Sequence, residues 1–134
     1  MRKSQFLFIA LALLLSSLCS CSQGNKEMQR NKEIATKYHD LNTNDIDVIL
    51  TDNFIGRHAK SLFTWNKEDH RKYLSNGESK KDSIINQIAE GNWVATRFIR
   101  TGIRDGKPAS VEVMHLKRFE NGKIVEIWEY YGCE

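Results

Sequence analysis

The last quarter of the chain, residues 111–131, carries the side chains best suited to acid–base chemistry. His115 is a natural general acid or base, because the pKa of histidine lies near neutrality. Glu126 could serve as a base if a dry pocket raised its pKa. Tyr130 could donate a hydrogen bond to a carbonyl oxygen on which negative charge develops. This combination predicts proton transfer next to a carbonyl group, as an isomerase requires.

The arrangement of these side chains depends on a hairpin turn at Asn121-Gly122. This dipeptide favours a two-residue turn, which places His115 opposite Trp128 and on one face of the sheet with Glu126. A three-residue loop with a bulge would shift the register by one residue and separate His115 from the other two. We favour the two-residue turn and expect these side chains to line a pocket.

Each candidate also has a purely structural explanation. His115 could pack against Trp128 and make a single hydrogen bond. Glu126 could form an ion pair with Lys117 across the sheet, as charged pairs on neighbouring strands do. Tyr130 could belong to a protein interface. The sequence leaves these alternatives open.

Other classes of site find no support in the sequence. Metal ligands must cluster, whereas the four histidines are scattered without a His-x-His or His-x-x-x-His pair: His39, His58, His70 and His115. No Gly-x-Ser-x-Gly motif marks a nucleophile. We therefore expect neither a metal nor another cofactor.

The N-terminus predicts export and a lipid anchor. An apolar run of about ten residues follows Arg2 and Lys3, which suits a signal peptide and is too short to span a bilayer. Leu18-Cys19-Ser20-Cys21 resembles the signal of bacterial lipoproteins, and Cys21 fits the position that is acylated. The resemblance implies a protein of the cell envelope, held by lipid on the periplasmic or cell-surface side of a bacterial membrane. The alternative is a plain secretory signal.

Residues 1–20 hold two of the 20 basic side chains, so their removal would leave 114 of 134 residues, with 18 basic and 17 acidic side chains. This length suits a single domain over residues 27–134, with residues 21–26 as a polar tether. The nearly neutral charge removes the electrostatic argument for nucleic-acid binding.

The first half of the chain predicts helices, because its apolar residues recur at spacings of three and four. We expect helices at residues 27–41, at about 46–50 and at 67–75, the last capped by Asn66. A short strand at residues 54–58 precedes the third helix.

The second half predicts strands at residues 83–89, 93–101, 109–119 and 123–131, with a longer loop over 102–108. Arg97 and Arg100 would lie on opposite faces of one strand, so at most one points inward. Helices followed by consecutive strands indicate an α+β fold. We expect a curved antiparallel sheet with about three N-terminal helices over its concave face.

This order of elements, together with residues 118–128, resembles the SnoaL-like polyketide cyclases of the nuclear-transport-factor-2-like superfamily. The segment reads RFENGKIVEIW, and the usual family wording is R-F-x-D-G-K-I-x-E-x-W. Two further family motifs resemble Asp52-Asn53-Phe54-Ile55 with His58, and Lys67-Glu68-Asp69-His70. The resemblance implies a cone with His58 at its mouth. We expect Phe54, Phe98 and Trp128 among the residues that line it.

One departure from the family concerns the position four residues after Trp128. Family members often carry an aspartate there, which acts as acid or base in the cyclases, and here it is Gly132. We therefore expect first a membrane-anchored cone that binds a small, mostly apolar molecule. The second expectation is an isomerase or cyclase that uses His115 or His58 with Tyr130. The third is a homodimeric interaction module, joined through the outer sheet face at Met114, Leu116 and Ile127.

Overall fold

The computed structural model describes residues 23–76 and 80–132. Residues 23–37 form the N-terminal helix, which ends in the 3-10 turn η1 (Tyr38–Asp40). The remaining elements are α2 (Ile46–Ile49), β1 (Leu50–His58), β2 (Thr64–Asn66), α3 (Lys67–Ser75), β3 (Lys81–Glu90), β4 (Trp93–Arg104), β5 (Lys107–Glu120) and β6 (Lys123–Tyr131). The predicted α+β class is confirmed. Cys21 and the predicted signal peptide lie outside the described residues.

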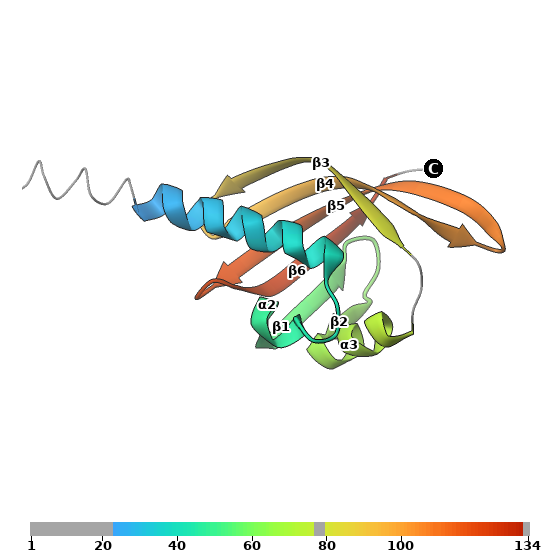
Figure 1. Cartoon of the computed structure of the whole chain (residues 1–134), viewed down its shortest axis with the longest axis horizontal. Coiled ribbons are helices and arrows are strands. Elements are labelled where there is room, and N and C mark those ends of the chain that lie inside the picture. Colours follow the sequence, from blue (N-terminus) through green and yellow to red (C-terminus); the bar gives the residue numbers. More distant parts are fainter. Residues whose placement is uncertain (1–22, 77–79, 133–134) are drawn as a thin grey trace, which may run out of the picture.

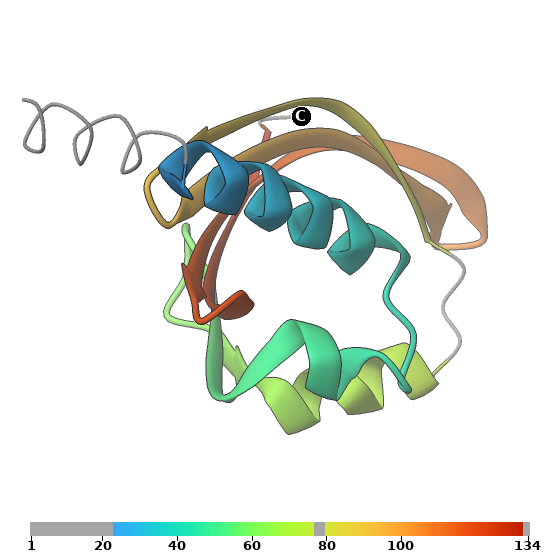
Figure 2. The ribbon, with the colours of Figure 1, turned by 60° about the vertical axis from the view of Figure 1, so that its left-hand side comes forward.

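The strands form one six-stranded sheet in the order β2-β1-β6-β5-β4-β3. Neighbouring strands are antiparallel except for β1 and β6, which run parallel. The sheet curls strongly, and the N-terminal helix lies along its concave side (Figures 1 and 2). The segment from α2 to α3 closes the opposite side, so the fold is the expected cone (Figure 2).

A hydrophobic core joins the N-terminal helix to the sheet. Ala35 and Tyr38 pack with buried side chains of the later elements, which include Ile46, Leu50, Phe54, Phe119 and Ile127. Burial of such side chains stabilises the fold by about 1.5–3 kcal/mol each. Among the described residues, no helix is both long enough and apolar enough to cross a membrane.

The hairpin between β5 and β6 has the predicted two-residue turn, but the register beyond it is not the predicted one. Asn121 and Gly122 adopt φ values of 51° and 73°, as this turn requires. Glu120 pairs with Lys123 and Phe119 pairs with Ile124, after which a bulge shifts the pairing by one residue. The extra residue, Val125, is buried together with Ile124.

The bulge overturns the predicted pairs further along the hairpin. His115 lies opposite Glu129, and Trp128 lies opposite Leu116. Glu126, Trp128 and Tyr130 therefore lie on the outer face of the sheet, because side chains alternate along a strand. Ile127, which we expected on the outer face, is fully buried in the core.

Three other features of the fold also differ from the predictions. Residues 23–26, expected in a tether, already belong to the N-terminal helix. The expected long loop at 102–108 is a two-residue turn at Asp105-Gly106, because both residues adopt positive φ and the strands continue to Arg104 and from Lys107. Strand β2 was not predicted; it is three residues long and pairs only with β1.

Candidate ligand-binding site

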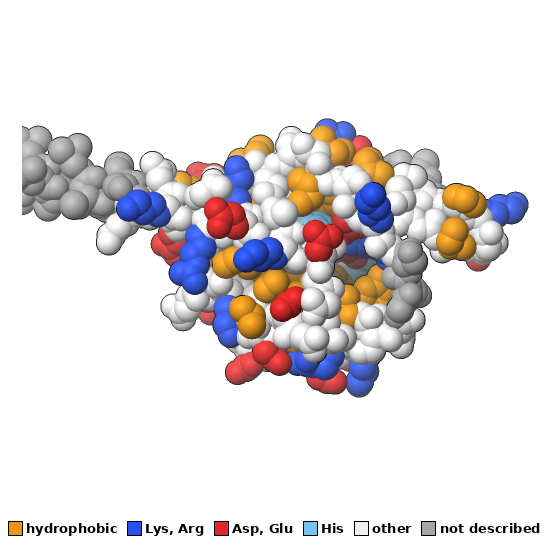
Figure 3. Space-filling model, in the orientation of Figure 1, with side chains coloured by type: hydrophobic (Ala, Val, Ile, Leu, Met, Phe, Trp, Pro, Cys, Tyr) orange, Lys and Arg blue, Asp and Glu red, His pale blue; other side chains and the backbone are white. Residues whose placement is uncertain are grey.

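A cavity of about 670 Å³ lies between the inner face of the sheet, η1 and α3. One part of its wall is apolar and aromatic: Tyr38, Leu41, Phe63, Trp65, Tyr73 and Leu74. In the space-filling view, histidine side chains are visible inside the hollow, with hydrophobic side chains around it (Figure 3). The volume lies in the range of small-molecule sites.

The floor of the cavity is polar and is built by four neighbouring strands. Asp82 on β3 lies opposite Arg100 on β4, and His115 on β5 lies opposite Glu129 on β6. Tyr131 follows two residues after Glu129 and therefore shares its face. The bulge in β6 is what brings Glu129 opposite His115. A local irregularity in the sheet thus places a carboxylate in the cavity.

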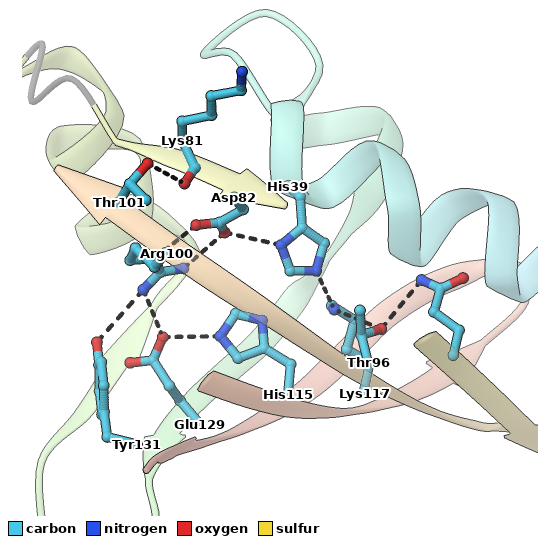
Figure 4. A network of polar contacts seen from close by, with 11 residues as sticks. His39, Lys81, Asp82, Thr96, Arg100, Thr101, His115, Lys117, Glu129 and Tyr131 are labelled. Carbon is cyan, nitrogen blue, oxygen red and sulfur yellow. Dashed lines mark hydrogen bonds and ion pairs between the residues drawn. The ribbon is translucent and has the colours of Figure 1, made fainter. Parts of the chain in front are cut away.

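Arg100 holds the two carboxylates of the floor together (Figure 4). Its Nε and Nη2 donate to Asp82 at 2.9 and 3.0 Å, and its Nη1 donates to Glu129 at 3.0 Å. The hydroxyl of Tyr131 lies 3.4 Å from the same Nη1. Burial opposes ionisation of Asp82, but hydrogen bonds from His39 and Arg100 hold its pKa well below the usual range. Burial likewise opposes ionisation of Glu129, but the hydrogen bond from His115 and the charge of Arg100 lower its pKa to about 2, so both carboxylates are charged at neutral pH.

His115 donates to Glu129 and keeps its second ring nitrogen unpaired. Nε2 lies 2.8 Å from Oε2 of Glu129, which can only accept a hydrogen bond when ionised. The proton is therefore on Nε2, and Nδ1 carries a lone pair. Nδ1 is buried and has no hydrogen-bond partner among the residues that the structure describes. Burial lowers the pKa of His115 to about 3, so the ring is neutral at neutral pH.

A second histidine connects the floor to a buried lysine. Nδ1 of His39 lies 2.9 Å from Asp82, and Nε2 accepts a hydrogen bond from Nζ of Lys117 at 3.0 Å (Figure 4). Lys117 also donates to Thr96 at 3.3 Å and is fully buried. Burial lowers the pKa of Lys117 to about 7. Lys117 lies behind His39 and is not a wall residue of the cavity.

The two predicted histidines both line the cavity. His58, on β1, stacks on Tyr131 with ring centres 5.2 Å apart. Its Nδ1 is buried and, like that of His115, has no partner within the described part of the chain. The structure thus brings His58 and His115 to one cavity.

The two phenylalanines predicted to line the cavity lie just outside it. Phe54 belongs to the core and faces the ring of His70 at 6.2 Å. Phe98 is fully buried against the rings of His39 and His115, at 4.4 and 4.7 Å. Both are too far inside the packing to form the wall, and they support the histidines that do.

Three further candidates lie on the outer face of the sheet and do not contribute to the cavity. Glu126 accepts hydrogen bonds from Arg57 at 2.9 Å and from Arg118 at 3.1 Å, so the predicted pair with Lys117 is wrong. The guanidinium of Arg57 stands over the ring of Trp128. Tyr130 is 37% exposed. All three positions follow from the one-residue shift at the bulge.

The arginine prediction is confirmed. Arg100 points into the cavity, whereas Arg97 points outward and pairs with Glu112 at 2.6 Å. Four residues of the floor were missed: His39, Asp82, Glu129 and Tyr131. Glu129 and Tyr131 were missed because the bulge in β6 was not predicted. Asp82 was missed because the strand predicted at residues 83–89 began one residue after it, whereas β3 begins at Lys81. The sequence does hold one signal for Glu129 and Tyr131: they follow the apolar Ile127 at spacings of two residues, so all three side chains lie on the same face of the strand.

Among residues 23–76 and 80–132, no group of three or more His, Cys, Asp or Glu side chains is arranged to hold a metal ion. The site described above offers an unpaired imidazole nitrogen, two ionised carboxylates, one arginine and a lysine of lowered pKa.

Residues 38–127 match the family model described as the SnoaL-like domain. No functionally curated protein matches the sequence significantly. Several solved structures share the fold. A protein of Jannaschia sp. CCS1, named as a candidate SnoaL-like polyketide cyclase, has a TM-score of 0.69 and 15% identity, over 78% of this chain and 86% of that one.

Two other similar structures carry different names. A protein of Catenulispora acidiphila DSM 44928 with a ketosteroid isomerase-like fold, solved in complex with trimethylamine, has a TM-score of 0.65 and 18% identity, over 75% of this chain and 85% of that one. An LEH-like epoxide hydrolase of M. tuberculosis has a TM-score of 0.66 and 13% identity, over 82% and 85%. Identities this low establish a common fold and nothing finer.

Proposed function

The chain belongs to the SnoaL-like domain family, and from that premise we propose that it binds a small, mostly apolar molecule in the cavity above His115. The observation that carries the proposal is the unpaired Nδ1 of His115. A buried polar atom without a partner costs about 1–3 kcal/mol, which a ligand with a hydrogen-bond donor would recover. The aromatic wall would bury the apolar body of such a ligand.

Binding is proposed ahead of catalysis because of the acid–base properties of His115. A general base works best when its pKa lies near the operating pH. The pKa of His115 is lowered to about 3, so the ring is a good acceptor and a weak base. Tyr130, the expected oxyanion donor, faces away from the cavity. Gly132 still stands where the cyclases often carry an acidic residue.

A proton-transfer enzyme is the second candidate, and Lys117 is the observation that favours it. Its pKa of about 7 is the value that suits acid–base catalysis near neutrality. His39, a wall residue of the cavity, lies next to it, and Nζ of Lys117 donates a hydrogen bond of 3.0 Å to Nε2 of His39. In such an isomerase or cyclase, His39 would pass a proton between Lys117 on its Nε2 and Asp82 on its Nδ1, and Asp82 lines the cavity.

The binding proposal is tested by NMR on the isotopically labelled protein, titrated with a library of small apolar molecules that carry hydrogen-bond donors. We expect saturable shifts at His115, Tyr131 and Leu74 and none at Met114 on the outer face. Shifts spread over the outer face, or no saturable shifts from any compound, would contradict the proposal. Turnover of a bound compound would favour the second candidate.

The lipid anchor remains part of the proposal. It is supported by the sequence Leu18-Cys19-Ser20-Cys21 after a short apolar run. We propose that Cys21 is acylated and that the domain lies at a bacterial membrane in the cell envelope. Intact mass spectrometry of the mature protein tests this directly. A chain that begins at Cys21 with added acyl mass supports the proposal, and an unmodified N-terminus refutes it.

A further inference from the structure

We propose that the ligand of this cavity is a small organic cation, with a protonated amine on an apolar body. This inference rests on the proposed function and narrows it to one class of ligand. Three independent features of the cavity carry it: the balance of charges in its wall, the direction of its hydrogen bonds, and the aromatic rings around it.

The charges of the wall favour a positive ligand. Among the described residues that line the cavity there are four carboxylates, of Asp40, Asp69, Asp82 and Glu129, and two cations, of Lys80 and Arg100. Three histidines of the wall do not restore the balance, because burial lowers the pKa of His39, His70 and His115. Asp40 and Asp69 are exposed, whereas Asp82 and Glu129 are largely buried. A ligand with one positive charge would therefore reduce the negative charge that its own binding desolvates at the floor.

The two cationic groups nearest the floor do not offset this excess for a ligand. Arg100 uses all three of its nitrogen atoms on Asp82, Glu129 and Tyr131. Lys117 lies behind His39 and carries only part of its charge at neutral pH, since its pKa is about 7. An anionic ligand would therefore meet two carboxylates in the floor, with the one arginine there already committed to them.

The hydrogen-bonding pattern of the floor favours a ligand that can donate a hydrogen bond. Nδ1 of His115 presents a lone pair, because the proton of this ring is on Nε2 and is donated to Glu129. A carboxylate or a carbonyl oxygen cannot satisfy this atom, since neither has a proton to give. An ammonium N–H can, and Glu129 then lies directly behind the ring to stabilise the added charge.

The aromatic wall suits the same class of ligand. A cation is attracted to the face of an aromatic ring at distances up to about 6 Å. Nζ of Lys80 already stands over the ring of Tyr73 at 4.5 Å, at the rim of the cavity. Phe63 and Trp65 stack at 6.0 Å and extend this aromatic rim. A neutral alcohol would satisfy Nδ1 of His115 equally well, but it would gain nothing from the rings or the carboxylates.

The test compares three probes of the same size on the full-length protein: benzylamine, benzyl alcohol and benzoate. Isothermal titration calorimetry at neutral pH measures each affinity. We expect benzylamine, protonated at this pH, to bind at least about tenfold more tightly than benzyl alcohol. We expect benzoate to bind more weakly than both.

Glu129→Gln supplies the matched variant. The amide oxygen of glutamine still accepts the hydrogen bond of His115, whereas the negative charge is lost. We expect about a tenfold loss of affinity for benzylamine and little change for benzyl alcohol. The control is Glu126→Gln, which removes a carboxylate on the outer face and should change neither. Asp82→Asn replaces Glu129→Gln if a thermal melt shows that the first variant does not fold.

Two results would overturn the inference. Equal or tighter binding of benzyl alcohol or benzoate would exclude a cation-selective cavity, while leaving the proposed binding function in place. Absence of saturable benzylamine binding up to about 10 mM would also overturn it, because a matched fragment of this size should bind in the millimolar range. The proposed function itself fails if the library titration finds no ligand for the cavity.

Discussion

Nε2 of His115 lies 2.8 Å from Oε2 of Glu129, and the two residues face each other across β5 and β6. The contact fixes the tautomer of the imidazole and leaves its buried Nδ1 without a partner in the described chain. It also places a negative charge behind a neutral ring. This pair defines how the cavity can recognise a ligand: through a donor, and with a preference for positive charge.

Acid should destabilise the fold, beginning near pH 6.5. The pKa of His115 falls from 6.5 to about 3 on folding, so between these values the unfolded state binds more protons and unfolding becomes easier as pH decreases. The expected loss for this residue is at most about 1.4 kcal/mol per pH unit. Urea unfolding from pH 7 to pH 4 measures it. The slope should be smaller in His115→Phe, and constant stability down to pH 4 would contradict the burial of a neutral His115.

Alkali should stabilise the fold between about pH 7 and pH 10.5. The pKa of Lys117 falls from 10.5 to about 7 on folding, so above pH 7 the unfolded state keeps a proton that the folded state releases. The free energy of unfolding should rise between pH 7 and pH 9, by about 2 kcal/mol at most. Lys117→Met should abolish this rise, whereas the exposed Lys107→Met should keep it. A flat profile in the unaltered protein would mean that Lys117 is solvated.

These two titrations concern residues whose burial the sequence did not reveal. The pattern of strands and the Asn121-Gly122 turn predicted the fold class and the local hairpin correctly. The register failed because Ile124 and Val125 are both apolar, and an alternating pattern does not show which of two adjacent apolar residues is the extra one in a bulge. Because of this one-residue shift, the predicted residues Glu126, Trp128 and Tyr130 lie outside the cavity. Glu129 and Tyr131 line it instead.

The histidines were easier to place than their partners. His115 lies on the inner face in the observed register, because the bulge shifts β6 against β5 and leaves β5 itself alternating. His39 is brought to Asp82 by contacts between η1 and β3, which are distant in sequence. Long-range contacts of this kind have no signature in local spacing, so the polar network of the floor could not be predicted.

Asn31→Leu should stabilise the protein by about 1 kcal/mol. Asn31 lies on the N-terminal helix and is 1% exposed, and neither polar atom of its amide has a partner among the described residues. Leucine has a similar size and removes the cost of an unsatisfied amide. Thermal unfolding measures the change. Asn25→Leu, at an exposed position of the same helix, is the control and should bring no gain; a loss of stability in Asn31→Leu would show that the amide is satisfied.

Gly56→Ala should distort the aromatic wall of the cavity. An added Cβ would lie 1.9 Å from Cε2 of Trp65, which pairs with Gly56 across β1 and β2. Trp65 must then move, at a cost of about 1–3 kcal/mol. We expect a lower melting temperature and weaker binding of any cavity ligand. Gly24→Ala, where a Cβ meets nothing within 4 Å, is the control. An unchanged melting temperature in Gly56→Ala would contradict the packing of Trp65.

Native mass spectrometry of the protein purified from cells that naturally produce it asks most directly whether the cavity around His115 holds a small molecule. Leu74→Trp fills the cavity from its apolar wall, and Met114→Trp adds the same side chain to the outer face. The unaltered protein and Met114→Trp should carry a bound mass that denaturation releases, and Leu74→Trp should lack it. No bound mass in the unaltered protein, or the same mass retained by Leu74→Trp, would contradict a ligand in this cavity.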